Sequence, residues 1–340
     1  MNTSLTQLRT ILTEPAPELF FTRNDAEDIR MGDIVLRRSE DWEKARESPI
    51  DVAIVGVPQD EGVKRNKGRE GAQKAPTEIR RALYKLTPFV PDEMSAAAGN
   101  KRLSGLRIFD LGDVLLGETL EETHDRLETV VATLMDHRII PIVLGGGHDI
   151  SYPNFRGFSR TAKRVGVVNI DTHLDYRLAV PMRHSGTSFR LMLDEPASVL
   201  APQNIVEFGI QPFANVEAHY RAMLERGTRI MMLDEIRKNG FAPAFAGALR
   251  IAADGTERTM VSFDMDAVRS SDAPGVSAPS PTGFFAEEIL QAAFECGMNT
   301  HVGMIDIAEV NPNFDVDNRT AKLAALVVMH FLSGFCRRMS

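Results

Sequence analysis

Three short stretches of the chain place carboxylates and imidazoles where they could bind a cation. The stretch VGVVNIDTHLDYR begins as an apolar run and ends with Asp171, His173 and Asp175 at alternate positions, which share one face of an extended strand. A protein core cannot hold two carboxylates on one face unless a positive charge lies among them. A bound cation is the simplest explanation, and the motifs GGGHD and SFDMD supply further candidate ligands: His148, Asp264 and Asp266.

The types of these six side chains indicate which metal they would bind. Two imidazoles and four carboxylates without a thiolate favour a hard or borderline divalent ion such as Mn²⁺. Six ligands suit two ions about 3.5–4 Å apart, bridged by carboxylates and a water of lowered pKa, and such a site hydrolyses an electrophilic carbon or phosphorus. Because alternate residues of a straight strand lie about 6.6 Å apart, the chain must curl after Asp171.

Eight apolar runs separated by helix-like segments predict the elements that position these residues. Their alternation predicts an α/β fold with a mostly parallel, eight-stranded sheet covered by helices on both faces. In such sheets ligands bind at the carboxyl ends of the strands, and the three motifs and Glu309 each follow the end of a run. The predicted strands are 51–57, 106–112, 139–147, 164–171, 204–210, 228–234, 258–266 and 300–310, with helices within 76–86, 118–137 and 285–296.

Composition and charge limit the classes of protein to which the chain can belong. The net charge of -8 argues against a nucleic acid or an anionic membrane as the main partner. Two distant cysteines form no disulfide framework, and the N-terminus lacks a signal-peptide pattern, so we expect a cytoplasmic protein. The apolar run 323–335 is too short to cross a bilayer and predicts a buried or interface helix. We expect one catalytic domain over residues 46–340, preceded by an N-terminal extension over residues 1–45.

Four motifs in order along the chain resemble the ureohydrolase family of arginase, agmatinase, guanidino-acid hydrolases and formimidoylglutamase: GGGHD, NIDTHLDYR, SFDMDAV and EVNPNFDVDNRTAKLAA. The resemblance implies a three-layer α/β/α fold and two Mn²⁺ ions per subunit. It implies that His148 and Asp175 ligate one ion, that His173 and Asp266 ligate the other, and that Asp171 and Asp264 bridge both. It also assigns Glu309 to the amidine or guanidinium of the substrate, since a carboxylate accepts two parallel N–H bonds from such a planar cation.

Three further segments are similar to formimidoylglutamases: DEGVKRNKGREGAQKAP, HSGTSF and APGVSAP. In HSGTSF, Ser185 stands where agmatinases have a histidine. The resemblance implies hydrolysis of N-formimino-L-glutamate to L-glutamate and formamide, a step of histidine breakdown, in which Asp175 could pass a proton to the departing amine. Because this substrate carries two carboxylates, we expect cationic groups in its pocket. The candidates are Arg65, Arg69, Arg183, His184 and Arg190.

Alternative functions remain open at this point. A guanidino-acid, agmatine or guanidine hydrolase would use the same metals and release urea. A non-catalytic metal-binding relative would lack one or more ligands, whereas all six are present, and a single-zinc deacylase needs fewer ligands. The family resemblance suggests a homo-oligomer, either a trimer or a hexamer. Five histidines without a pattern are expected to be structural or to lie on the surface: His124, His137, His219, His301 and His330.

Overall fold

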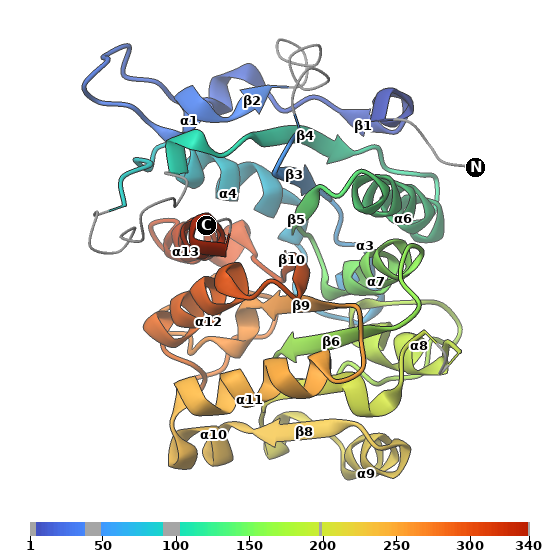
Figure 1. Cartoon of the computed structure of the whole chain (residues 1–340). Coiled ribbons are helices and arrows are strands. Elements are labelled where there is room, and N and C mark those ends of the chain that lie inside the picture. The colour runs from blue at the N-terminus through green and yellow to red at the C-terminus, as the bar shows by residue number, and fades with distance from the viewer. Residues whose placement is uncertain (1–4, 38–48, 91–102, 197–198, 339–340) are drawn as a thin grey trace.

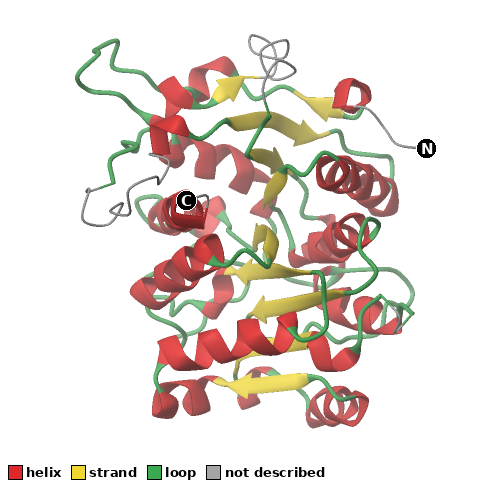
Figure 2. Cartoon of the chain, viewed as in Figure 1, coloured by secondary structure: helices red, strands yellow, loops and turns green. Residues whose placement is uncertain are grey.

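The computed structural model describes residues 5–37, 49–90, 103–196 and 199–338. These residues form a ten-stranded sheet in the order β1-β4-β3-β5-β10-β9-β6-β7-β8, with β2 also paired to β4 (Figures 1 and 2). The strands are β1 (Leu12–Thr13), β2 (Leu36–Arg37), β3 (Val52–Gly56), β4 (Ile108–Val114), β5 (Ile140–Leu144), β6 (Val165–Ile170), β7 (Ile205–Ile210), β8 (Arg229–Met232), β9 (Arg258–Asp264) and β10 (Val302–Ala308).

All eight predicted strands are present as β3 to β10, and every pairing among them is parallel. The predicted number of strands was nevertheless wrong, because β1 and β2 extend the sheet to ten. Strand β1 pairs antiparallel with β4, and β2 pairs parallel with it. Each of the two added strands has only two residues. Strands this short show no periodic pattern in a sequence.

Helices cover both faces of the sheet, which confirms the predicted three-layer α/β/α arrangement (Figure 2). One face carries α1 (Met31–Ile34), α4 (Ala75–Leu83), α10 (Leu233–Asn239), α11 (Phe241–Ala253), α12 (Ala286–Met298) and α13 (Arg319–Arg338). The other face carries α6 (Leu120–Asp136), α7 (Ser151–Ser159), α8 (Ser188–Asp194) and α9 (Glu217–Arg226). The short helix α3 (Glu61–Arg65) follows β3.

Two hydrophobic cores lie between these layers, one on each face of the sheet. Alternate residues of a strand enter different cores, so that Val52 and Ile54 of β3 belong to one core and Ala53 and Val55 to the other. All five residues of β3 are buried. This double burial explains why the strands appear in the sequence as continuous apolar runs.

The C-terminal helix α13 is longer than the apolar run from which it was predicted. It spans 20 residues, and its length and hydropathy would allow it to cross a membrane. Within the fold, however, 72% of its most apolar window is buried, and it packs against α12 and α4. Its apolar face therefore belongs to the core of the domain.

The N-terminal segment takes part in both cores. Leu8 and Leu12 join one core, and Met31 and Val35 join the other. The predicted boundary at residue 45 lies outside the described residues, so the division into an extension and a catalytic domain stays a prediction.

Four neighbouring strands create the crevice in which the motifs meet. In the sheet, β10 and β9 lie between β5 and β6. Along the chain, however, β6 is the next strand after β5. The order of the strands therefore changes direction at this point, and in α/β sheets a ligand binds beyond the carboxyl ends of the strands at such a position.

Candidate metal centre

Each candidate ligand follows the carboxyl end of one of these four strands. His148 begins a 3₁₀ turn after β5, Asp171 directly follows β6, and Asp264 is the last residue of β9. Asp266 lies in the turn after β9, and Glu309 directly follows β10. The candidate metal ligands and Glu309 thus lie at one edge of the sheet, at the ends of four parallel strands, as the sequence predicted.

The loop after β6 curls as the spacing of its ligands required. The strand ends at Ile170, and the backbone N–H of His173 then donates to Asp171 Oδ1 at 2.7 Å. Asp175 has a φ of 42°, a left-handed conformation that residues other than glycine seldom adopt. This turn brings three side chains, which would lie far apart on a straight strand, to one place.

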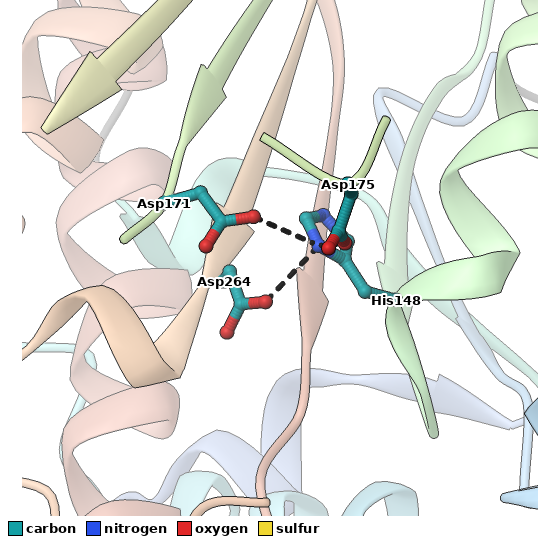
Figure 3. Close-up of side chains that lie close together, drawn as sticks. All are labelled: His148, Asp171, Asp175 and Asp264. Carbon is teal, nitrogen blue, oxygen red and sulfur yellow. Dashed lines mark ion pairs between the residues drawn. The ribbon is translucent and has the colours of Figure 1, made fainter. Parts of the chain in front are cut away.

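The six candidate ligands form two overlapping groups around the two imidazoles. His148 Nδ1 lies 2.9 Å from Asp175 Oδ2, 3.0 Å from Asp264 Oδ2 and 3.2 Å from Asp171 Oδ2 (Figure 3). His173 Nδ1 lies 3.3 Å from Asp266 Oδ2 and 3.5 Å from Asp171 Oδ1. Atoms of each group are close enough to hold one ion.

The two oxygens of Asp171 face different imidazoles, which is the arrangement that a bridging carboxylate needs. Asp264 belongs to the first group alone, and its Oδ1 accepts the backbone N–H of Asp266 at 2.8 Å. The predicted bridging by Asp264 therefore stays a prediction.

The electrostatics of the cluster fit bound cations. Burial, together with the charges of Asp266 and Asp171, raises the pKa of Asp264 well above its usual value, and burial likewise raises the pKa of Asp175 and of Asp266. Asp266 Oδ1 is buried without a hydrogen-bond partner, and His148 Nδ1 is crowded by three carboxylate oxygens. A divalent ion in each group would relieve the repulsion and use these atoms, and the donor set suits Mn²⁺.

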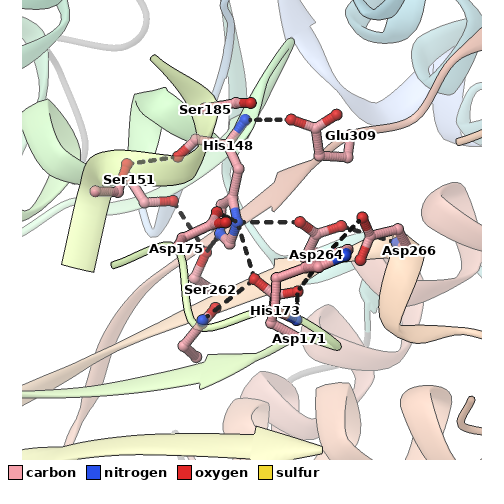
Figure 4. A network of polar contacts seen from close by, with 12 residues as sticks. His148, Ser151, Asp171, His173, Asp175, Ser185, Ser262, Asp264, Asp266 and Glu309 are labelled. Atoms are coloured by element: carbon pink, nitrogen blue, oxygen red, sulfur yellow. Dashed lines mark hydrogen bonds and ion pairs between the residues drawn. The ribbon is translucent and has the colours of Figure 1, made fainter. Parts of the chain in front are cut away.

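Glu309 lies beside the two groups with one oxygen unused (Figure 4). Its Oε1 accepts the backbone N–H of His148 at 2.8 Å, whereas its buried Oε2 has no hydrogen-bond partner. Burial raises the pKa of Glu309 to about 8. Its φ of 63° is again left-handed, a conformation that costs about 1–3 kcal/mol and is characteristic of functional sites.

A buried polar chain that the sequence did not reveal supports His148. His148 Nε2 lies 2.9 Å from Ser262 Oγ (Figure 4). Ser262 Oγ in turn donates to Asp306 Oδ1 at 2.5 Å. Asn154 Nδ2 donates to Asp306 Oδ2 at 2.8 Å. Such partners fix the orientation and tautomer of a metal-binding histidine. Ser262 and Asp306 lie inside β9 and β10, where a sequence pattern shows only strand residues.

A second buried network holds the turn that contains His148. Asp149 Oδ2 accepts from Gln59 Nε2 at 2.7 Å and lies 2.8 Å from His124 Nε2. His124, which is buried, was predicted to be structural or to lie on the surface, and its contact with Asp149 gives it a structural place in this network.

A cavity of about 730 Å³ lies beside the candidate ligands, and its volume is within the usual range for a small-molecule site. His173, Asp175, Asp264, Asp266 and Glu309 line it. So do residues without a predicted role in binding: Asn66, Arg177, Ser185, Asn215 and His219. For His219 a structural or surface role was predicted, and its place in this cavity adds a possible contact with a ligand.

The cationic side chains predicted to bind substrate are not among the described residues that line this cavity. Arg65 pairs with Glu61 and Glu121. Arg69 donates to two backbone carbonyls, those of Val276 and Ser277. The remaining three are engaged locally: Arg183 and Arg190 lie over the rings of Tyr152 and Tyr176, and His184 accepts from the backbone N–H of Gly186. These contacts occupy the five side chains locally, and their predicted part in substrate binding stays a prediction.

Comparison with known proteins places the chain in a family. The family model described as the arginase family matches residues 50–334. The chain belongs to the arginase family. Formimidoylglutamase of Geobacillus kaustophilus, an arginase-family relative, is 34% identical over 289 residues, 84% of each chain. That of Ralstonia nicotianae is 33% identical over 335 residues, 95% of this chain and 97% of the relative.

A solved structure of an arginase-family relative matches the whole architecture. The crystal structure of Trypanosoma cruzi formiminoglutamase with Mn²⁺ superimposes with a TM-score of 0.81 at 34% identity. The match covers 92% of this chain and 99% of that one. The resemblance read from the sequence motifs, and the arginase-like fold that it implied, are thus confirmed.

Proposed function

We propose that this chain is a binuclear manganese hydrolase that converts N-formimino-L-glutamate and water to L-glutamate and formamide. The observation that carries the proposal is the crowded group of two imidazoles and four carboxylates, with the unused oxygen of Glu309 beside it. The similarity to formimidoylglutamases over most of the chain supports the choice of substrate.

In this proposal the six side chains divide between two Mn²⁺ ions. His148 and Asp175 would hold one ion, His173 and Asp266 the other, and Asp171 and Asp264 would contact both. The ions would supply an activated water as the nucleophile and stabilise the negative charge that develops at the attacked carbon. Ser262 holds the imidazole of His148 in position from the opposite side of its ring.

Glu309 and Asp175 would act on the substrate itself. Glu309 Oε2 would accept an N–H of the formimino group, so that the electrophilic carbon faces the two groups of ligands. Asp175, which lines the same cavity, would pass a proton to the departing amine nitrogen of L-glutamate. Formamide would keep the formimino carbon and its other nitrogen.

A panel of substrates tests the proposal. Mn²⁺-loaded protein is incubated with N-formimino-L-glutamate, agmatine, arginine, guanidine and 4-guanidinobutanoate, and formamide, urea and ammonia are measured. We expect formamide and L-glutamate from the first compound and no urea from the others. Urea from a guanidino compound, with N-formimino-L-glutamate unchanged, would establish instead the alternative function of a guanidino hydrolase.

The proposal also covers the pathway, the location and the oligomeric state of the protein. A place in histidine breakdown follows from the substrate. A cytoplasmic location and assembly into a trimer or a hexamer stay predictions, which fractionation and light scattering can test.

A further inference from the structure

The cavity beside the metal centre is lined by side chains of both charges. Its carboxylates are those of Asp264, Asp266 and Glu309, which are buried, and of Asp175, which is partly buried. Among the described lining residues, one side chain is an arginine or lysine, and this is Arg177, which is exposed. A ligand that is cationic at its reacting end and anionic at its tail would match this distribution of charge.

Arg177 has most of its hydrogen-bonding capacity available. Its Nη1 donates to Asn66 Oδ1 at 3.2 Å, and it forms no ion pair with any carboxylate of the described residues. A guanidinium carries five N–H donors in a planar fork that fits a carboxylate. By contrast, Arg65 already binds two glutamates.

The neighbours of Arg177 fix its backbone and contact its side chain. Its backbone N–H donates to Gly186 O at 2.9 Å, and Asn66 Nδ2 donates to Ser185 Oγ at 3.0 Å. A Cβ on Gly186 would lie 3.1 Å from Arg177 Cδ and 3.1 Å from Asn66 Nδ2. The segment HSGTSF thus supplies a hydroxyl that holds Asn66 and a glycine that leaves room for the arginine.

We propose that Arg177, held by Asn66 and Ser185, binds a carboxylate of the substrate and selects acid-tailed amidines over amine-tailed ones. This inference rests on the proposed function, because N-formimino-L-glutamate combines a formimino group with two carboxylates. A cationic tail, such as that of agmatine, would meet the like charge of Arg177.

Steady-state kinetics of Arg177→Gln test this role with two substrates. N-formimino-L-glutamate carries carboxylates, whereas N-butylformamidine offers the same reacting group on an uncharged chain. Loss of charge-assisted hydrogen bonds raises KM for the acidic substrate by about 10- to 100-fold and leaves kcat within a few-fold. The kcat/KM for N-butylformamidine stays unchanged, and Arg177→Lys restores part of the lost affinity.

A binding measurement and a control variant separate recognition from damage to the fold. Calorimetry on Mn²⁺-loaded protein measures the affinity for L-glutamate. We expect this affinity to fall in Arg177→Gln by a factor similar to the rise in KM. Arg221→Gln is the control, because Arg221 is exposed on α9 and pairs with Glu217, and neither of the two lines the cavity. An unchanged KM for N-formimino-L-glutamate in Arg177→Gln, or an equal loss with N-butylformamidine, overturns the inference.

The same variants distinguish failure of the inference from failure of the proposed function. If the wild type releases urea from 4-guanidinobutanoate and leaves N-formimino-L-glutamate intact, the proposed function fails. The role of Arg177 is then tested by comparing kcat/KM of Arg177→Gln for 4-guanidinobutanoate and for agmatine. A loss of activity on 4-guanidinobutanoate alone supports the inference. A wild type that prefers agmatine overturns both.

Discussion

At the scale of single residues, the site depends on side chains that the sequence motifs contain and on others that they do not. Asp171, His173 and Asp175 were recognisable because polar residues at the end of an apolar run are unusual. Ser262 and Asp306 were not, because a serine or an acid within a strand does not reveal which neighbour it contacts. The chain of contacts from His148 through Ser262 to Asp306 depends on the pairing of β9 with β10 and on the position of the turn after β5.

Replacing Ser262 with alanine is expected to weaken the metal centre. Without its hydroxyl, His148 Nε2 loses the partner that fixes the ring, and losses of this kind lower metal affinity or activity by about 10- to 100-fold. Equilibrium dialysis with Mn²⁺ measures the change. Ser159→Ala is the control, because Ser159 Oγ donates only to Arg156 O in α7. Equal Mn²⁺ affinity in Ser262→Ala and wild type would contradict this role.

Replacing Glu309 with glutamine is expected to affect catalysis and to spare metal binding. The substitution removes a charged acceptor for the amidine, so kcat/KM falls by about 10- to 100-fold, as for a lost charge-assisted hydrogen bond. Kinetics and metal analysis of the same preparation test this, with exposed Glu225→Gln as the control. Loss of Mn²⁺ together with activity would instead make Glu309 part of the metal centre.

At the scale of elements, the sequence predicted the eight long strands and the helices α4, α6 and α12, because each carries a pattern several residues long. It missed β1 and β2, which form only through their pairing with β4. It also missed the place of Arg177, since the loop after β6 has no periodicity. What could be predicted was periodic or motif-like, and what could not was set by contacts between distant segments.

Two glycines allow α12 and α13 to pack closely. A Cβ on Gly334 would lie 2.2 Å from Phe294 O, and one on Gly297 would lie 2.1 Å from Phe331 O. Neither carbonyl can move without disturbing its helix. The close contact of the two helices therefore requires residues without a Cβ at these two positions.

Gly334→Ala is accordingly expected to destabilise the fold, whereas Gly247→Ala is expected to stabilise it. The first overpacks a helix interface, at a cost of about 1–3 kcal/mol in the free energy of unfolding. The second adds a methyl group to α11 where no atom lies within 4 Å and gains about 0.5–1 kcal/mol. Urea unfolding of both variants measures the difference. A Gly334→Ala protein as stable as Gly247→Ala would show that the interface can relax.

At the scale of the whole molecule, the metal centre links distant parts of the chain. Its candidate ligands follow three strands of the sheet, β5, β9 and β6, so bound ions would join segments as far apart in the sequence as His148 and Asp264. A centre of this kind stabilises the folded state, because the unfolded chain does not preserve the site.

Removing metal with EDTA is therefore expected to lower Tm. Binding contributes about 4 kcal/mol at a thousandfold excess of ion over Kd. Differential scanning calorimetry with and without Mn²⁺ measures the shift, and metal analysis should find two ions per chain. In Asp171→Asn, which changes the residue shared by both groups, added Mn²⁺ should raise Tm much less. A wild-type Tm that does not respond to Mn²⁺ would contradict this stabilising role.

The most direct test of the proposed hydrolysis identifies which C–N bond of the substrate breaks. Mn²⁺-loaded protein is given N-formimino-L-glutamate labelled with ¹³C at the formimino carbon, and the reaction is followed by NMR. We expect the label in formamide, with one L-glutamate formed for each formamide, because Asp175 protonates the amine of glutamate. Label in N-formyl-L-glutamate with release of ammonia, or no reaction, would contradict it.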